Sequence, residues 1–348
     1  MSVLDHTATT ARIGALRRAR RNGRLRLAAG MIALLTLGVY ATLVTGPTMA
    51  PPADLLRVLT GETVPGASFA ILDLRLPRAT LSILTGMSFG LGGVIFQTLL
   101  RNPLASPDII GISAGASAAA VFAIVVLGWS GPAVSVIAVI AGLGVALLIY
   151  LLAWRDGVSG ARLILIGIGL SAMLDSMIAY VVSRAPAWTM QEAMRWLTGS
   201  VNGATLAEAL PVLLSLTILG GLLLARRSNL EAMRLGDDTA AALGVPLALD
   251  KVLAIMAAVG LIAVATAVSG PIAFVAFLSG PIATRIAGPG RSPLIPAALV
   301  GALLVLVGDY IGQHLLTGRY PVGVVTGALG APYLIYLIVR SNRTGGET

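Results

Sequence analysis

Predominantly apolar stretches recur along the chain, with short polar segments between them. They cover residues 27–46, 79–100, 109–128, 132–154, 163–183, 206–225, 252–269, 271–287, 293–316 and 321–339. A helix needs about 20 mostly apolar residues to cross the hydrocarbon core of a bilayer. The pattern therefore predicts an all-α, polytopic membrane protein with about ten transmembrane helices.

The first and the eighth stretches need separate interpretation. The first follows a long basic segment and exceeds the roughly 7–15 apolar residues of a signal peptide, so we expect it to be a retained membrane helix. The eighth is short and is interrupted by Gly270, Pro271, Gly280 and Pro281. It is consistent with a straight membrane helix or with a half-helix joined to a re-entrant piece.

Three connections are long enough to have structure of their own. Residues 47–77 join the first two stretches. Residues 185–205 alternate Trp and Met with Gln, Glu and Arg, which predicts a short amphipathic helix at the membrane surface. Residues 226–251 contain LGDDTAAALGVP, in which Asp237 and Asp238 suit the first turn of a helix and Gly-Val-Pro ends it.

Basic residues are unevenly divided between the two sides that ten helices define. The net charge is +9, and seven arginines precede the first apolar stretch. With the N-terminus inside, 18 of the 24 basic residues lie in cytoplasmic segments and six lie outside. Cytoplasmic loops of membrane proteins are enriched in Lys and Arg. We therefore expect both termini in the cytoplasm and no nucleic-acid partner.

This orientation gives a simple domain organisation. A basic cytoplasmic tail covers residues 1–26, and a single ten-helix domain covers 27–340, with a cytoplasmic loop at 226–251. A second short cytoplasmic tail covers 341–348.

Composition excludes most catalytic chemistry. The chain is 57% hydrophobic and only 11% charged, contains no cysteine, and has two histidines, His6 and His314. Disulfides, iron–sulfur clusters and thiol catalysis are thereby excluded, and a metal site is not expected. A P-loop needs a lysine after glycine, whereas the only lysine, Lys251, follows Asp250. The residues indicate a transporter or channel subunit that is driven by a partner rather than an enzyme.

Few acidic residues lie inside apolar stretches, where ionisable groups are costly and often functional. Asp175 is near the middle of the fifth stretch and Asp309 is in the ninth. Asp175 is equally compatible with a water-filled path and with a hydrogen bond to a neighbouring Ser or Thr. For Asp309 we favour internal bonding.

Four motifs in chain order carry a family resemblance. They are RLPR at 75–78, RNPLASPDIIGISAGAS at 101–117, LGDDTAAALGVP at 235–246 and YPVGVVTGALGAPYLIYL at 320–337. Together they resemble the FecCD-type permeases, the membrane subunits of ABC importers for ferric siderophores, haem and vitamin B12. The segment LLAWRDGVSGARLILIGIGLSAML at 151–174 is most similar to the enterobactin-type subgroup, which pairs with a paralogous permease.

The resemblance implies a type II ABC importer permease in the cytoplasmic (inner) membrane of a bacterium. Its expected partners are a paralogous permease, an ATPase homodimer and an extracytoplasmic siderophore-binding protein. No cofactor is expected on this chain, because ATP and magnesium belong to the ATPase. Transport would proceed by alternating access.

The resemblance also assigns roles to residues. The outer arginines that would dock the binding protein are Arg75 and Arg78, and anchoring of the second span at the membrane surface is the alternative role for both. The cytoplasmic gate maps onto Asn102, Leu104, Gly160 and Ala161. The contact with the ATPase maps onto Leu235, Gly236, Asp237, Asp238, Ala242, Leu243, Gly244 and Val245. Asp175 is a candidate for the translocation path.

The sequence departs from the family pattern at two places. The family often has Pro-His-Ile-Ala-Arg in the eighth span, where this chain has Gly280, Pro281, Ile282, Ala283 and Thr284 before Arg285. An outer arginine expected late in the ninth span falls near Gln313, and Arg319 is the candidate to replace it. Cobalamin or haem as cargo, and a proton-coupled secondary transporter, are the alternative functions.

Overall fold

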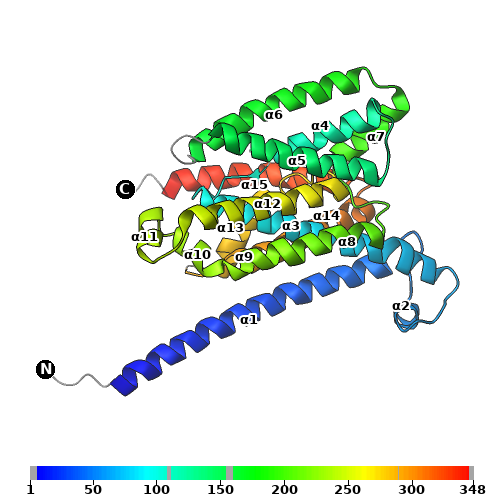
Figure 1. The fold of residues 1–348 in the computed structure, drawn as a ribbon. Coiled ribbons are helices and arrows are strands. Elements are labelled where there is room, and N and C mark those ends of the chain that lie inside the picture. The colour runs from blue at the N-terminus through cyan, green and yellow to red at the C-terminus, as the bar shows by residue number, and fades with distance from the viewer. Residues whose placement is uncertain (1–5, 108–110, 154–159, 289, 345–348) are drawn as a thin grey trace.

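The most deeply buried helix is α3, Leu76–Leu99, which continues the π-helical segment η1, Phe69–Arg75. The computed structural model describes residues 6–107, 111–153, 160–288 and 290–344. Within them α3 packs against α12 (Leu247–Ser269), α13 (Val275–Ala287) and α14 (Leu294–Tyr310). The four helices form the centre of the bundle (Figure 1).

Glycines allow α3 and α14 to approach closely. A methyl group at Gly86 would lie 2.4 Å from the carbonyl oxygen of Gly301, and one at Gly90 would lie 2.2 Å from that of Ala297. In lipid, where burial of apolar surface provides no driving force between helices, such close packing holds a bundle together.

The remaining membrane helices surround this centre. They are α1 (His6–Val44), α4 (Ile112–Val125), α5 (Pro132–Ala153), α6 (Gly160–Ser183), α8 (Leu206–Ser215) with η3 (Leu216–Gly220) and α9 (Gly221–Ala225), and α15 (Val322–Thr344). The segment η4 (Ile311–Leu315) extends α14. Among the described residues, seven helical segments are long and apolar enough to cross a membrane, and three further apolar helices are shorter. This confirms the helical membrane fold expected from the ten apolar stretches.

The short eighth stretch is a half-helix. Helix α12 ends at Ser269, Gly270 has φ +69°, and α13 begins only at Val275. Its 13 residues are about 20 Å long at 1.5 Å per residue, which is less than the roughly 30 Å of the hydrocarbon core. The second of the two interpretations of this stretch therefore fits the structure.

The connections contain the expected short helices. Helix α7 (Ala187–Leu197) occupies the amphipathic segment, and α2 (Pro52–Leu59) lies in the first connection. The loop 226–251 holds α10 (Arg227–Met233) and α11 (Asp237–Ala242). Helix α1 is continuous across residue 26, so the basic tail and the first membrane helix form one rod that leaves the bundle at an angle (Figure 1).

Candidate functional site

The face of the bundle where α1 ends contains a cavity of about 790 Å³. By the distribution of basic residues this is the outer face. The cavity is lined by all three arginines expected to dock a partner, Arg75, Arg78 and Arg319, and by Asp309 and His314.

Arg75 is buried against the C-terminal end of α1. Its guanidinium donates hydrogen bonds to the carbonyl oxygens of Leu43 (2.8 Å), Val44 (3.1 Å) and Thr48 (2.8 Å). The last carbonyls of a helix lack partners inside it and carry the negative end of the helix dipole. Arg75 therefore fixes the end of α1 to the start of α3, and Gly46 leaves the space that its guanidinium needs, since a methyl there would lie 2.2 Å from Nη2.

Arg78 forms a nearly buried ion pair with Asp309. Its Nε and Nη2 donate to the two carboxylate oxygens at 2.6 and 2.7 Å, and Nη1 donates to Asn202 Oδ1 at 3.2 Å. Side-chain exposure is 16% for Arg78 and 4% for Asp309. The expected internal bonding of Asp309 is confirmed, but its partner lies 231 residues away in sequence, which no local motif indicates.

Arg319 remains open to solvent in the same cavity. It is exposed, and it forms no ion pair within the described part of the chain. Gln313, at the place of the expected family arginine, also lines this cavity, and its Nε2 donates to the Tyr320 carbonyl at 3.1 Å. Of the three arginines expected to dock a partner, Arg319 has the guanidinium most available to it.

The cytoplasmic face holds a second cavity of about 690 Å³. It brings Asn102 and Leu104 of the α3–α4 connection next to Gly280, Pro281 and Arg285 of α13. Asn102 Oδ1 accepts from the Leu104 backbone N–H at 2.9 Å, which holds the connection in a tight turn. The other two expected gate residues, Gly160 and Ala161, begin α6, and their side chains lie outside the described part.

Arg285 is held beside this cavity by two aromatic rings. It donates to the Tyr333 hydroxyl at 3.2 Å and lies 5.6 Å from the ring centroid of Tyr336. The sequence-divergent end of α13 is thereby joined to α15.

Helix α11 projects from the cytoplasmic end between two glycines in positive-φ conformations. Gly236 has φ +117° and Gly244 has φ +81°, which only glycine adopts without strain. Leu235 and Leu243, at the two ends, are 67% and 65% exposed. Ala242 is exposed and Val245 is half-buried, so this short helix presents apolar side chains to the cytoplasm.

Asp237 connects α11 to two other elements. Its Oδ2 accepts from Lys251 Nζ of α12 at 2.6 Å, and its Oδ1 pairs with Arg101 at the end of α3. The hydrogen bond from Lys251 lowers the pKa of the Asp237 carboxyl, and the charges of Lys251 and Arg101 act in the same direction. Asp238 is exposed and has no ion pair within the described residues.

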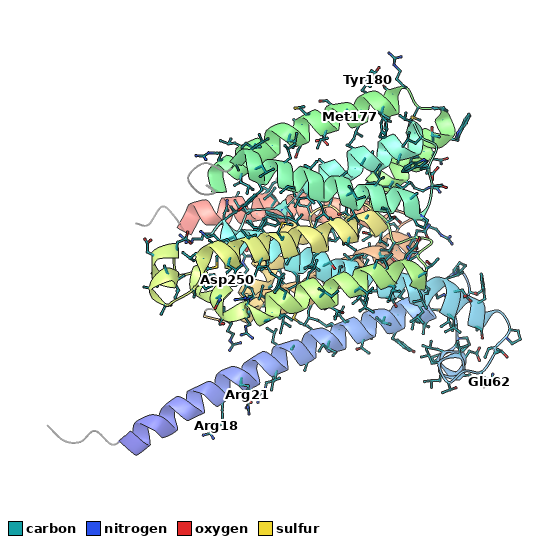
Figure 2. All side chains as sticks on the ribbon, in the orientation of Figure 1. Arg18, Arg21, Glu62, Met177, Tyr180 and Asp250 are labelled. Carbon is teal, nitrogen blue, oxygen red and sulfur yellow. The ribbon has the colours of Figure 1, made fainter. Side chains whose placement is uncertain are left out.

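A third acid of this region, Asp250, was not indicated by the sequence pattern. It is 1% exposed at the start of α12 and accepts from Asn229 Nδ2 of α10 at 2.6 Å (Figure 2). Arg226 lies 3.4 Å from its other oxygen, which makes an ion pair without the alignment of a hydrogen bond. Asp250 thus anchors the helices that carry α11.

Asp175 lies on α6, at the edge of the bundle opposite α1 (Figure 1). It is exposed on α6, where Met177 and Tyr180 are also exposed (Figure 2). Within the described part of the chain its carboxylate has no hydrogen-bond partner. The described residues also contain no group of three or more His, Asp or Glu side chains placed to hold a metal ion.

Comparison with known proteins identifies the fold and the family. The model of the FecCD transport family matches residues 34–340. The chain belongs to the FecCD transport family.

Two relatives share most of their length with this FecCD protein. The ferric enterobactin transport system permease protein FepG of Escherichia coli strain K12 is 39% identical over 314 residues, covering 89% of this chain and 94% of FepG. The ferric enterobactin transport system permease protein FepD of the same organism is 33% identical over 321 residues, covering 91% and 96%. A solved structure of a metal-chelate type ABC transporter in an inward-facing conformation superimposes with a TM-score of 0.81 at 25% identity, covering 90% of this chain and 99% of that one.

Proposed function

We propose that this chain is a permease subunit of an ABC importer that moves ferric siderophores across the cytoplasmic membrane of a bacterium by alternating access. The family match over residues 34–340 carries the proposal, since it extends through the bundle from the C-terminal part of α1 into α15. The similarity to FepG supports a siderophore as cargo.

The exposed helix α11 is proposed as the contact with an ATPase dimer. Leu235 and Leu243 are large apolar side chains left uncovered outside the membrane span, and a partner surface would bury them. ATP and magnesium bind to that partner, and this chain has no lysine placed for a P-loop.

The ion pairs of Asp237 can pass a movement of α11 on to the gate. A displacement of α11 acts through Arg101 on the connection that holds Asn102 and Leu104, and through Lys251 on α12. We propose that Asn102 and Leu104, together with Gly160 and Ala161 at the start of α6, form the cytoplasmic gate.

The outer cavity is proposed as the docking surface for an extracytoplasmic binding protein. Arg319 supplies a guanidinium that has no ion pair among the described residues, and its planar donors suit carboxylates of a partner. Arg75 and Arg78 contribute by fixing the surrounding surface, since their own donors bond within the chain. The exposed α6, with Asp175, is proposed to face a paralogous permease and the path between the two subunits.

Uptake in the source bacterium tests this function. Deletion of the gene should abolish uptake of ⁵⁵Fe supplied as a ferric siderophore, and the intact gene should restore it. Depletion of ATP should stop uptake, whereas an uncoupler given while ATP is maintained should not. If the deletion strain took up siderophore normally but lost uptake of haem or cobalamin, the cargo would be haem or cobalamin instead.

The Gly244→Val variant is the matched test of the α11 assignment. A β-branched residue at φ +81° strains the end of α11 while leaving the membrane helices intact. We expect normal membrane insertion with strongly reduced uptake, and full uptake would count against α11 as the ATPase contact.

A further inference from the structure

An apolar groove separates α1 from the rest of the bundle. It has a volume of about 580 Å³ and is lined by α1, α13, α14 and α15, with side chains such as Leu34, Leu278, Ile282 and Leu303. Its one charged lining residue among those described is Arg26, at the cytoplasmic end. The groove follows from the course of α1, which diverges from the bundle toward the N-terminus (Figure 1).

A second cavity, of about 170 Å³, continues the groove toward the cytoplasm. Leu27 and Met31 line both cavities, so the two cavities form one continuous strip along α1. Here the lining becomes basic and polar, with Arg227, Arg291 and Ser292. An apolar slot with a basic end is therefore built into one side of the molecule.

The length of the groove suits a lipid chain. Along α14 and into η4 the lining residues run from Val300 to Ile311, which is about 17 Å at 1.5 Å per residue. One leaflet contributes half of the roughly 30 Å hydrocarbon core. Because Gly308 and Ile311 flank Asp309 of the outer cavity, the groove extends beyond the cytoplasmic leaflet and is at least as long as one acyl chain.

At the basic end, two guanidinium groups have no ion pair and one buried hydroxyl has no hydrogen-bond partner among the described residues. Arg291 lies against α1, where a methyl at Gly23 would be 3.0 Å from its Nη2, and Arg26 follows one turn later. Neither arginine forms an ion pair among the described residues, whereas Arg227 pairs with Glu231 at 2.8 Å. The Ser292 hydroxyl is buried and has no hydrogen-bond partner in the described structure.

We propose that this groove binds an anionic phospholipid of the cytoplasmic leaflet. An acyl chain lies between α1 and the α13–α14 face, and the phosphate lies between Arg26 and Arg291, within reach of the Ser292 hydroxyl. A soluble anion would leave the apolar lining uncovered, and a zwitterionic headgroup would bring a cation toward two unpaired guanidinium groups. Basic pockets between membrane helices on the cytoplasmic side are suited to anionic headgroups.

Lipid retention tests the proposal on the full-length protein, purified from membranes and analysed by native mass spectrometry. Wild type should retain phosphatidylglycerol in preference to phosphatidylcholine. Each arginine near the membrane surface is worth about a fivefold change in affinity, so R26Q/R291Q should bind phosphatidylglycerol roughly 25-fold more weakly.

The matched control is R18Q/R21Q. It removes the same amount of charge, at two residues of α1 that line neither cavity (Figure 2). Its retention of phosphatidylglycerol should stay within about twofold of wild type, on the same scale. Equal retention by R26Q/R291Q and wild type, or no preference over phosphatidylcholine in wild type, would overturn the proposal.

A measurement on wild type keeps the test independent of how the variants fold. Phosphatidylglycerol with a photoactivatable acyl chain should label Met31 and Leu303 in nanodiscs. Labelling confined to other faces, or a crosslink from this groove to another protein subunit, would show that the groove has a different occupant.

Discussion

Replacement of Asp237 by Asn tests whether α11 moves the gate through ion pairs. The change keeps the size of the side chain and removes its charge. Asp237, Arg101 and Lys251 have side chains 43%, 47% and 37% exposed, so both pairs lie in a largely aqueous environment. Exposed ion pairs contribute about 0.2–1 kcal/mol each, which gives roughly 0.5–2 kcal/mol for the two together.

The expected effect is a loss of coupling. A link of about 1 kcal/mol changes the equilibrium between two positions of α11 about fivefold. We therefore expect the cargo transported per ATP hydrolysed to fall about fivefold in proteoliposomes that contain the permease with its partner subunits. Asp238→Asn is the comparison variant: it removes the same charge from α11 at an exposed residue that has no ion pair among the described residues, so it measures the effect of charge loss at the ATPase contact alone.

Salt and pH give the reasoning two independent checks. The Debye length is only about 3 Å at 1 M salt, so wild type at high salt should approach the Asp237→Asn variant. Because the pKa of Asp237 is lowered in the folded state, its stabilisation is present above the ordinary Asp value near 3.9 and is lost only as pH falls through the lowered value. Coupling through this link should therefore be constant between about pH 6 and 8. Equal coupling ratios in wild type and both variants would refute the transmission route.

Three further predictions concern the bundle and its path. Asp309→Ala leaves Arg78 without its partner and should lower the free energy of unfolding by about 3 kcal/mol in thermal or denaturant unfolding. The double variant R78L/D309L should be destabilised less, and an Asp309→Ala variant as stable as wild type would contradict this. Gly90→Ala places a methyl 2.2 Å from a carbonyl oxygen of α14 and should cost about 1–3 kcal/mol, whereas Gly144→Ala, with no atom within 4 Å, should be close to neutral. Asp175→Asn should change siderophore uptake less than about threefold, roughly 0.7 kcal/mol, and abolished uptake in a normally inserted variant would show that the charge itself is required.

The membrane helices and the α11 turn could be predicted because their signals are local. Run length is enough to find a membrane helix, and the acids followed by Gly-Val-Pro are enough to place α11 between Gly236 and Gly244. Even the broken eighth stretch was marked by its glycines and prolines.

The partners of the outer arginines could not be predicted, for a physical reason. The pairing of Arg78 with Asp309 depends on α3 lying against α14, and helices of nearly uniform apolar composition carry no charge pattern that specifies this neighbour. The family resemblance implied that Arg75 lies at the outer face and docks a partner, but its burial depends on where α1 ends. The RLPR motif at 75–78, from which docking was predicted, thus also has a structural role inside the chain.

The structure separates a rigid centre from elements that can move. Backbone contacts at Gly86 and Gly90 leave no space for α3 and α14 to slide without a clash, and the Arg78–Asp309 pair locks their outer ends. Helix α6, by contrast, has few buried side chains and contacts α4 and α5 rather than the centre. When α11 is displaced, the tightly packed α3 is therefore expected to move little, and the loosely packed α6 is expected to move more easily. We therefore expect the cytoplasmic side to open by movement of α6 away from a stationary α3–α14 pair. Spin labels on α6 and α14 should then report a change in their distance, whereas labels on α3 and α14 should report none.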